Sequence, residues 1–324
     1  MGRYLLSLVV LVCLLSAGPS QAATATVRTI ETITLRDASR QRDIPLKIYY
    51  PAGMRNAPLI IFSHGYGSDR DGYAYLASGW ASDGYVVILP THEGGDRQAA
   101  LGGGYGAMLR GESVVTGAQL DANAHDISFL ISSLGEIVRQ APQLLGAFDP
   151  KRIGVAGHSM GAGTTLVVDG ATLPGTSTSV ADLRPVAFIA MSPQGMYSSA
   201  DAHRWDAIER PTMTMYGSAD SGEQRQPPNW REDPFEHMPP GNKYNVVVDG
   251  ANHFSFADEA KTQAVATFLA KGQTRSIDEI HAFVVRATLV FWDAYLKDNS
   301  AAKAALRSGK NLVPDLPIGT YTSK

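Results

Sequence analysis

The serine in a five-residue glycine turn is the side chain best placed to do chemistry. Ser159 lies at the centre of the sequence GHSMG, residues 157–161, and follows the apolar run 153–156. The glycines permit a sharp strand-to-helix turn that lifts the serine oxygen to a helix N-terminus, where backbone N–H groups favour developing negative charge. The pattern predicts that Ser159 is a nucleophile in acyl transfer. An ordinary tight turn is the alternative, in a chain with 32 glycines.

An aspartate and a histidine later in the chain have the spacing to activate this serine. A serine hydroxyl is a poor nucleophile until a base removes its proton. His253 follows an apolar run and a glycine turn, and Asp220 follows the apolar run before that one. The order Ser159, Asp220, His253 is one of the chain orders in which such triads occur. Asp249 is the competing acid, but it stands four residues before His253, a position that favours capping the turn.

Two backbone N–H groups are expected to stabilise the negative charge that forms on a substrate oxygen. One belongs to Met160, directly after the nucleophile. The other is expected at Tyr66, in the glycine loop SHGYG of residues 63–67, which follows the apolar run 59–62. Glycines let a backbone approach a substrate closely, and two preset donors form an oxyanion hole. A plain strand-end turn in this loop is the alternative.

Two further polar residues are candidates for contacts with a substrate. His92 follows an apolar run, where it either lines a pocket or is a structural histidine with satisfied hydrogen bonds. Gln194 lies in the sequence SPQG, residues 192–195, after the apolar run that follows the serine turn. Residues 93–124 and 224–243 are expected to form long loops at the edge of the pocket, because long loops in compact domains are often functional.

The histidines do not have the spacing of a metal site. Metal-binding histidines often occur as HExxH or at comparable spacing. No such spacing is present at His125, His203, His237 or His281. The glycine-rich stretch 102–106 lacks the Gly-Lys-Ser/Thr sequence of a phosphate-binding loop. A catalytic zinc and a phosphate-binding loop are therefore not expected. His64 and His158 are expected to support the oxyanion loop and the serine turn.

Apolar runs alternate with helical patterns along the chain, and these elements must position the site. Six continuous apolar runs, typical of parallel strands that are buried on both faces, lie at 59–62, 85–89, 152–156, 186–190, 212–216 and 245–248. Helical spacing of apolar residues recurs at 73–82, 121–140, 162–168 and 277–297. A leading hairpin is expected from 26–35 and 46–50. This order predicts an α/β fold with a doubly wound, mostly parallel sheet and helices on both faces.

Composition excludes several classes of protein. The chain has 324 residues, of which 44% are hydrophobic and 18% charged, and its formal net charge is −3. Such a chain can bury a large core, and its low net charge argues against long disorder. The absence of a basic run argues against nucleic acid as the main partner. No shift in composition divides the chain into separate domains.

Residues 1–22 have the features of a signal peptide. One arginine precedes an apolar stretch at 4–17, and small residues then lead to Ala22. The stretch is shorter than the about 20 residues that a membrane span needs, so stable membrane insertion is not expected; a retained signal anchor is the alternative. Cleavage after Ala22 would leave residues 23–324 as a single domain without cysteine, because Cys13 lies in the signal. We expect a periplasmic or secreted protein.

Several segments together resemble one group of hydrolases. Besides the serine turn, they are SHGYG at 63–67, GYVV at 84–87, FDPKRI at 148–153, MSPQG at 191–195 and ANHFSF at 251–256. In these the chain is similar to the predicted dienelactone-hydrolase group, which borders the platelet-activating-factor acetylhydrolases and the cutinase-like polyester hydrolases within the α/β-hydrolase fold. The resemblance implies a Ser–Asp–His hydrolase of carboxylic esters without cofactor. By this resemblance, the triad would be Ser159, Asp220 and His253. The oxyanion hole would be formed by Tyr66 and Met160.

The chain departs from parts of this group in two ways. True dienelactone hydrolases use a cysteine at the nucleophile turn, whereas this chain has Ser159 there. Polyester-degrading cutinases often carry a C-terminal disulfide and a tryptophan shortly after the turn, whereas residues 167–169 here are Val-Val-Asp. The expected substrate is therefore a small-molecule or lipid-like ester. An amidase or peptidase of the same fold and a non-catalytic binding protein are the alternatives.

Overall fold

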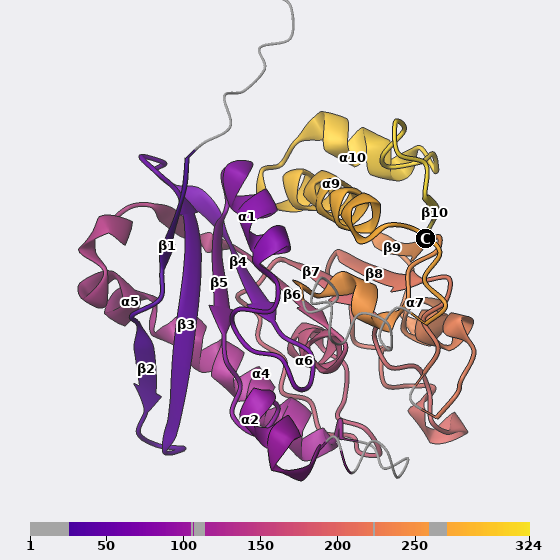
Figure 1. Cartoon of the computed structure of the whole chain (residues 1–324), viewed down its shortest axis with the longest axis horizontal. Helices are drawn as coiled ribbons and strands as arrows, with labels where there is room; N and C mark the ends of the chain where they lie inside the picture. Colours follow the sequence, from indigo (N-terminus) through magenta and orange to yellow (C-terminus); the bar gives the residue numbers. More distant parts are fainter. Residues whose placement is uncertain (1–25, 105, 107–113, 223, 259–270) are drawn as a thin grey trace, which may run out of the picture.

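The computed structural model describes residues 26–104, 106, 114–222, 224–258 and 271–324 (Figure 1). The expected signal peptide, residues 1–22, lies outside the described residues, as does Cys13. In this part of the chain, no helix is long and apolar enough to cross a membrane. Nor does any group of three or more His, Cys, Asp or Glu side chains among the described residues have an arrangement that could hold a metal ion.

Ten strands of the described residues form one sheet, in the order β1-β3-β5-β4-β6-β7-β8-β9-β10, with β2 paired to β3. Their bounds are β1 Val27–Ile30, β2 Thr34–Asp37, β3 Arg42–Pro51, β4 Ala57–Ser63, β5 Val86–Pro90, β6 Phe148–His158, β7 Ala187–Met191, β8 Thr212–Gly217, β9 Lys243–Val248 and β10 Gly319–Ser323. Every pairing among β4 to β9 is parallel. The prediction of a mostly parallel sheet is confirmed.

The α-helices are α1 Ala74–Ser82, α2 Arg97–Ala99, α4 Gly117–Ser132, α5 Leu134–Gln140, α6 Met160–Asp169, α7 Asp233–His237, α9 Ile277–Leu296 and α10 Ser300–Arg307. Single turns of other helix types are η1 Ala100–Gly104, η2 Pro142–Leu144, η3 Ser199–Asp201, η4 Pro228–Glu232 and η5 His253–Phe256. Figure 1 shows helices on both sides of the sheet.

Alternate residues of the central strands supply two cores, one on each face of the sheet. On one face, Ile60 and Phe62 belong to a core shared with α1 and α9. On the other face, Leu59 and Ile61 belong to a core shared with α4, α5 and α6. Strands covered on both faces need apolar residues at every position, which explains why β4 is a continuous apolar run. The prediction of helices on both faces is confirmed.

Strand β3 lies next to the edge strand β1, and its pairings are antiparallel. It is ten residues long and pairs with β1 along its C-terminal half and with β2 along its N-terminal half. The sequence predicts one strand over 26–35, but the chain breaks between the two short strands at 31–33. Ile33 in this break is 1% exposed, and its carbonyl accepts the Leu46 N–H at 2.9 Å. Burial of the Ile33 side chain is therefore favoured here over continuous strand pairing.

Strand β10 closes the opposite edge of the sheet and is not predicted by the sequence. It pairs antiparallel with β9, from Gly319 opposite Val248 to Ser323 opposite Tyr244. Its sequence GTYTS is polar and leaves every position exposed or half-buried, so hydrophobic patterning gives little signal. The strand forms because the edge of β9 offers unpaired backbone groups, and hydrogen bonds rather than burial supply the pairing.

The helix predicted over 121–140 is two helices with a break at Ser133. Helix α4 begins earlier than predicted, at Gly117. Ser133 ends α4 and precedes α5 with φ −99° and ψ 11°. Just before it, the Ser132 hydroxyl donates to the Ser128 carbonyl at 2.9 Å. Serine hydroxyls compete for helix carbonyls and so weaken the helix at this point.

The two segments predicted as long loops contain short helices. Helices α2 and η1 lie within the first segment, as does the start of α4, and η4 and α7 lie within the second. Most of 105–113 lies outside the described residues. Gly95 of the first segment packs against the side chain of Met160, where a Cβ on the glycine would lie 2.4 Å away. The first segment therefore lies against the N-terminus of α6.

Candidate active site

Strand β6 delivers Ser159 to the N-terminus of α6 through a sharp turn. Ser159 has φ 55° and ψ −117°, a strained conformation for a residue with a side chain. A Cβ on Gly161 would lie 2.0 Å from the Ser63 carbonyl oxygen, and a Cβ on Gly157 would lie 2.2 Å from the Gly161 carbonyl oxygen. Both glycines are required, because a side chain on Gly161 would collide with the end of β4 and a side chain on Gly157 would collide with the backbone of the turn itself.

The structure brings Ser159, Asp220 and His253 into one hydrogen-bonded line. His253 Nε2 lies 2.9 Å from Ser159 Oγ, and His253 Nδ1 lies 3.0 Å from Asp220 Oδ1. Asp220 follows β8 and His253 follows β9, so strands of one sheet position all three side chains. Asp249 instead binds Arg275 at 3.1 Å, with both side chains substantially exposed. The geometry favours Asp220 over Asp249 as the acid.

Asp220 is a buried carboxylate whose charge is held by its neighbours. Burial alone would raise the pKa of Asp220, but the charges of Arg231 and His253 outweigh this effect and hold it well below its usual value. The Ser192 hydroxyl donates to its second oxygen, Oδ2, at 2.5 Å. Asp220 therefore stays negatively charged at any pH at which a neutral histidine could act as a base.

His158, next to the serine, links the backbone of His253 to the loop after β4. Its Nε2–H donates to the His253 carbonyl oxygen at 3.0 Å, so its Nδ1 accepts a hydrogen bond from the Tyr73 hydroxyl at 2.9 Å. The Tyr73 oxygen accepts the Gly65 N–H at 3.1 Å. Burial, together with the nearby His253, lowers the pKa of His158 well below its usual value. The ring therefore stays neutral and keeps this tautomer.

Tyr66 and Met160 lie at the two positions expected to supply oxyanion donors. Tyr66 follows β4, and Met160 is the first residue of α6, whose N–H has no partner within the helix. The Gly67 N–H donates to the Gly95 carbonyl at 2.9 Å and ties the Tyr66 loop to the segment after β5. A Cβ on Gly104 would lie 1.7 Å from the Tyr66 hydroxyl, so η1 touches this ring. The role of the two N–H groups stays a prediction.

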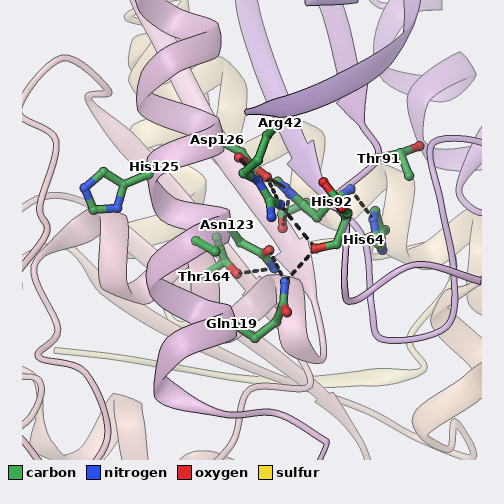
Figure 2. Close-up of polar contacts among 12 residues, drawn as sticks. Arg42, His64, Thr91, His92, Gln119, Asn123, His125, Asp126 and Thr164 are labelled. Atoms are coloured by element: carbon green, nitrogen blue, oxygen red, sulfur yellow. Dashed lines mark hydrogen bonds and ion pairs between the residues drawn. The ribbon is translucent and has the colours of Figure 1, made fainter. Parts of the chain in front are cut away.

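A buried polar network adjoins the Tyr66 loop (Figure 2). His92 Nδ1 lies 3.0 Å from Asp126 Oδ2, and His92 Nε2 lies 3.0 Å from Ser63 Oγ. The main-chain N–H of His92 donates to His64 Nε2 at 2.9 Å. The His92 side chain is 0% exposed and both of its ring nitrogens have protein partners. A buried ring with both nitrogens bonded to protein groups cannot contact a substrate. The structure therefore favours the alternative interpretation, in which His92 is a structural histidine.

Asp126 is the charged centre of this network. Its carboxylate binds Arg42 at 2.8 and 3.0 Å and Arg40 at 2.8 Å, in addition to His92. Burial would raise the pKa of Asp126, but the hydrogen bonds and charges of His92 and Arg42 lower it to about 2. Asp126 thereby connects α4 to the start of β3, and through His92 to the ends of β4 and β5. These contacts fix the chain on which the Tyr66 loop begins.

Gln194 follows β7 and lies against the first turn of α6. A Cβ on Gly163 would lie 3.0 Å from the Gln194 side-chain oxygen. Gln194 is 8% exposed, and its amide nitrogen has no hydrogen-bond partner among the described residues. A buried donor without a partner costs free energy, and an acceptor on a ligand would offset that cost. The predicted substrate contact fits this position and stays a prediction.

Two residues that hold the site together are missed by the sequence analysis. Tyr73 connects His158 to the loop after β4, and the side chain of Arg231 is 2% exposed and contacts Asp220. Arg231 stands in the sequence NWRED, which is typical of a solvated surface, and Tyr73 has the pattern of an apolar helix face. No local signal distinguishes them, because their polar partners come from distant parts of the chain.

Comparison with known proteins agrees with this fold. The protein family described as platelet-activating factor acetylhydrolase, isoform II, matches residues 39–104. The matched segment runs from before β3 to η1, and it contains the Tyr66 loop and His92 but not the triad. The predicted resemblance to the platelet-activating-factor acetylhydrolases is confirmed over this segment, and the chain has the α/β-hydrolase fold. No curated protein matches the sequence.

The buried neutral histidines predict a loss of stability in mild acid. Burial lowers the pKa of His64 to about 3, and it also lowers the pKa of His158. Unfolded histidines titrate near pH 6.5, so below roughly this pH the unfolded chain binds protons that the folded chain does not. We expect the free energy of unfolding to fall by roughly 1.4 kcal/mol per pH unit for each such histidine. Urea unfolding at a series of pH values from neutral downward measures this slope.

A matched pair of variants separates this effect from general acid sensitivity. His64→Gln removes a buried ring, whereas His203→Gln removes a ring that is 88% exposed. We expect the slope of unfolding free energy against pH to become shallower in His64→Gln and to stay unchanged in His203→Gln. An unchanged slope in both variants would contradict the assignment of His64 as a buried neutral group.

Asp126→Asn is expected to destabilise the fold through its ion pairs. Removing one partner of a buried pair leaves charge uncompensated, so the free energy of unfolding should fall by about 3 kcal/mol. Asp315→Asn, the control, breaks a pair with Arg286 in which the side chains are 71% and 45% exposed, and solvent screening should make its effect on stability small. Urea unfolding at neutral pH compares the two variants. Equal losses would show that Asp126 is not a buried anchor.

Proposed function

We propose that the protein is a serine hydrolase that cleaves carboxylic ester bonds through an acyl-enzyme intermediate. The observation that carries this proposal is the hydrogen-bonded line from Asp220 through His253 to Ser159. The family that matches residues 39–104 is described as an acetylhydrolase, an enzyme of the ester-cleaving kind. The family supports ester hydrolysis as the class of reaction, and the triad geometry supports its mechanism.

In the first step His253 acts as a general base. Its Nε2 removes the hydroxyl proton as Ser159 Oγ forms a bond to the ester carbonyl carbon, and the carbonyl electrons move onto oxygen. Asp220 accepts the Nδ1–H, which leaves Nε2 with a lone pair that faces the serine. The carboxylate also stabilises the imidazolium that forms.

The backbone N–H groups of Met160 and Tyr66 stabilise the resulting oxyanion. Helix α6 contributes the positive end of its dipole at the same point. The His158–Tyr73 link and the network around Asp126 both hold the chain that carries Tyr66. Donors that are already in place need no reorganisation when charge develops, which is why such holes lower the barrier.

In the second half of the cycle the tetrahedral intermediate collapses. The bond to the alcohol oxygen breaks, and His253 gives its proton to the leaving alcohol. Water then attacks the acyl carbon as His253 Nε2 removes a proton from it. The bond from the acyl carbon to Ser159 Oγ breaks, His253 returns the proton to Oγ, and the carboxylic acid leaves. The same histidine nitrogen serves every proton transfer, so no cofactor is required.

The proposed substrate is a small-molecule or lipid-like ester. The family description names an acetylhydrolase, an enzyme that removes an acetyl group by hydrolysis, and this favours a short acyl group. Phe254, which is 37% exposed and lies edge-on to the His253 ring at 5.5 Å, offers an apolar surface beside the reacting bond. Gln194 offers its amide nitrogen to a substrate oxygen. Residues 1–22 are proposed to export the protein to a periplasm or the medium.

Hydrolysis of a p-nitrophenyl ester series, acetate through palmitate, tests the proposal. We expect turnover that is greatest for short acyl chains. Ser159→Ala and His253→Ala should each lower kcat by roughly 10⁴-fold or more, and the double variant by no more than either alone, because the two residues act as a unit. Ser308→Ala, at the exposed end of α10, is the control and should keep full activity. Ser159→Ala with most of the activity retained would overturn the proposal.

A further inference from the structure

Arg231 is a buried cation at the back of the proposed triad. Its side chain is 2% exposed, and its Nε lies 2.6 Å from Asp220 Oδ1. The same guanidinium donates to main-chain carbonyl oxygens of Ser192 and Pro193 after β7, at 3.0 and 3.1 Å, and of Asp220 and Ser221 after β8, at 3.0 and 3.1 Å. One side chain of η4 therefore connects the ends of two adjacent strands.

The ion pair and the proposed catalytic hydrogen bond use the same carboxylate oxygen. Asp220 Oδ1 receives both Arg231 Nε and His253 Nδ1, while Oδ2 receives the Ser192 hydroxyl. The other groups that bind the guanidinium are carbonyl oxygens, which carry no net charge. Among the contacts of Arg231 that the structure describes, Asp220 is thus the one anion. A guanidinium keeps its positive charge throughout the pH range of enzyme reactions.

We propose that Arg231 is a positioning residue that sets the pH range of hydrolysis, because it offsets part of the negative charge that Asp220 presents to His253. This inference rests on the proposed function. A triad carboxylate without a cation beside it favours the protonated histidine, which cannot act as a base. A cation on the same oxygen opposes that protonation. Arg231 thereby keeps the base neutral, and the reaction running, to lower pH.

The other charged or titratable groups around His253 are engaged elsewhere. Besides Asp220 and Arg231, the charged or titratable groups of the surrounding segments include His158, Glu232, Asp258 and His281. His158 is a neutral ring that contacts the His253 carbonyl, and His281 contacts the Ser255 carbonyl.

Two carboxylates in this group also have partners of their own. Glu232 binds Tyr216 and Asn245, and Asp258 accepts N–H groups at the start of α1. Of the described groups, Asp220 bonds to the His253 ring and Arg231 bonds to Asp220. The balance between these two opposite charges is therefore what the inference concerns.

The pH dependence of kcat/KM in Arg231→Gln and Arg231→Lys tests the inference. Both variants lose the forked contacts to the four carbonyls, but Arg231→Lys keeps a positive charge. In Arg231→Gln we expect the acid limb of the profile to move up by about 1 pH unit or more. In Arg231→Lys the limb should stay within about half a unit of the wild type. Identical acid limbs in the wild type and Arg231→Gln would overturn the inference.

A second measurement does not require activity and separates this inference from the proposed function. NMR of protein labelled with ¹⁵N-histidine follows the titration of the His253 ring directly, with His253→Gln used to assign its signals. In Asp220→Asn the anion is gone and Arg231 remains, so we expect the ring to titrate well below the ordinary histidine value of about pH 6.5. A midpoint at or above that value would contradict an effect of Arg231, whether or not the wild type hydrolyses esters.

If Arg231→Gln and Asp220→Asn do not fold alone, the double variant Asp220→Asn/Arg231→Gln carries the same test. It removes both charges together and leaves no unpaired ion in the core. The midpoint of the His253 ring should then fall by less than about 1 pH unit, because the loss of the cation offsets much of the effect of losing the anion. A midpoint that falls by about 1 pH unit or more would show that Asp220 acts unopposed in the wild type, and would overturn the inference.

Discussion

The structure depends on the close approach of β4 to the turn between β6 and α6. Two glycines allow backbone contact there, and the Ser63 carbonyl lies where a side chain on Gly161 would have to be. The contact holds Ser159 in a strained conformation and places the loop after β4 beside it. One constraint thus positions both the proposed nucleophile and the proposed oxyanion donors. The parallel pairing of β4 with β6 fixes the register in which this contact occurs.

Two arrays of serine, histidine and aspartate lie in the part of the chain that the structure describes, and they differ in solvent access. The array of Ser63, His92 and Asp126 has the same order of contacts as the proposed triad, but all three residues are 0% exposed. In the proposed triad the His253 side chain is 19% exposed. The buried array also binds Arg40 and Arg42 through Asp126, and it holds α4 against the start of β3. The same residue types therefore do structural work on one side of the loop after β4 and are available for chemistry on the other.

The parts of the structure set by local sequence could be predicted, and those set by distant partners could not. The GHSMG turn and the continuous apolar strands depend on neighbours in the chain, and they gave the fold class and the position of Ser159. The order of strand ends then pointed to His253 and Asp220. The buried place of Arg231 depends on carbonyls of two other loops, and β10 depends on a free sheet edge. Neither leaves a pattern in its own segment.

The central claim is that Ser159 is the nucleophile of an acyl-enzyme. The most direct measurement is covalent labelling with an alkyl fluorophosphonate, followed by intact mass and peptide mapping. The account predicts one adduct per chain, located on Ser159, absent from Ser159→Ala and formed far more slowly in His253→Ala. The sealed Ser63 should stay unlabelled. An adduct on another residue, or rapid ester hydrolysis by a protein whose Ser159 cannot be labelled, would contradict the account.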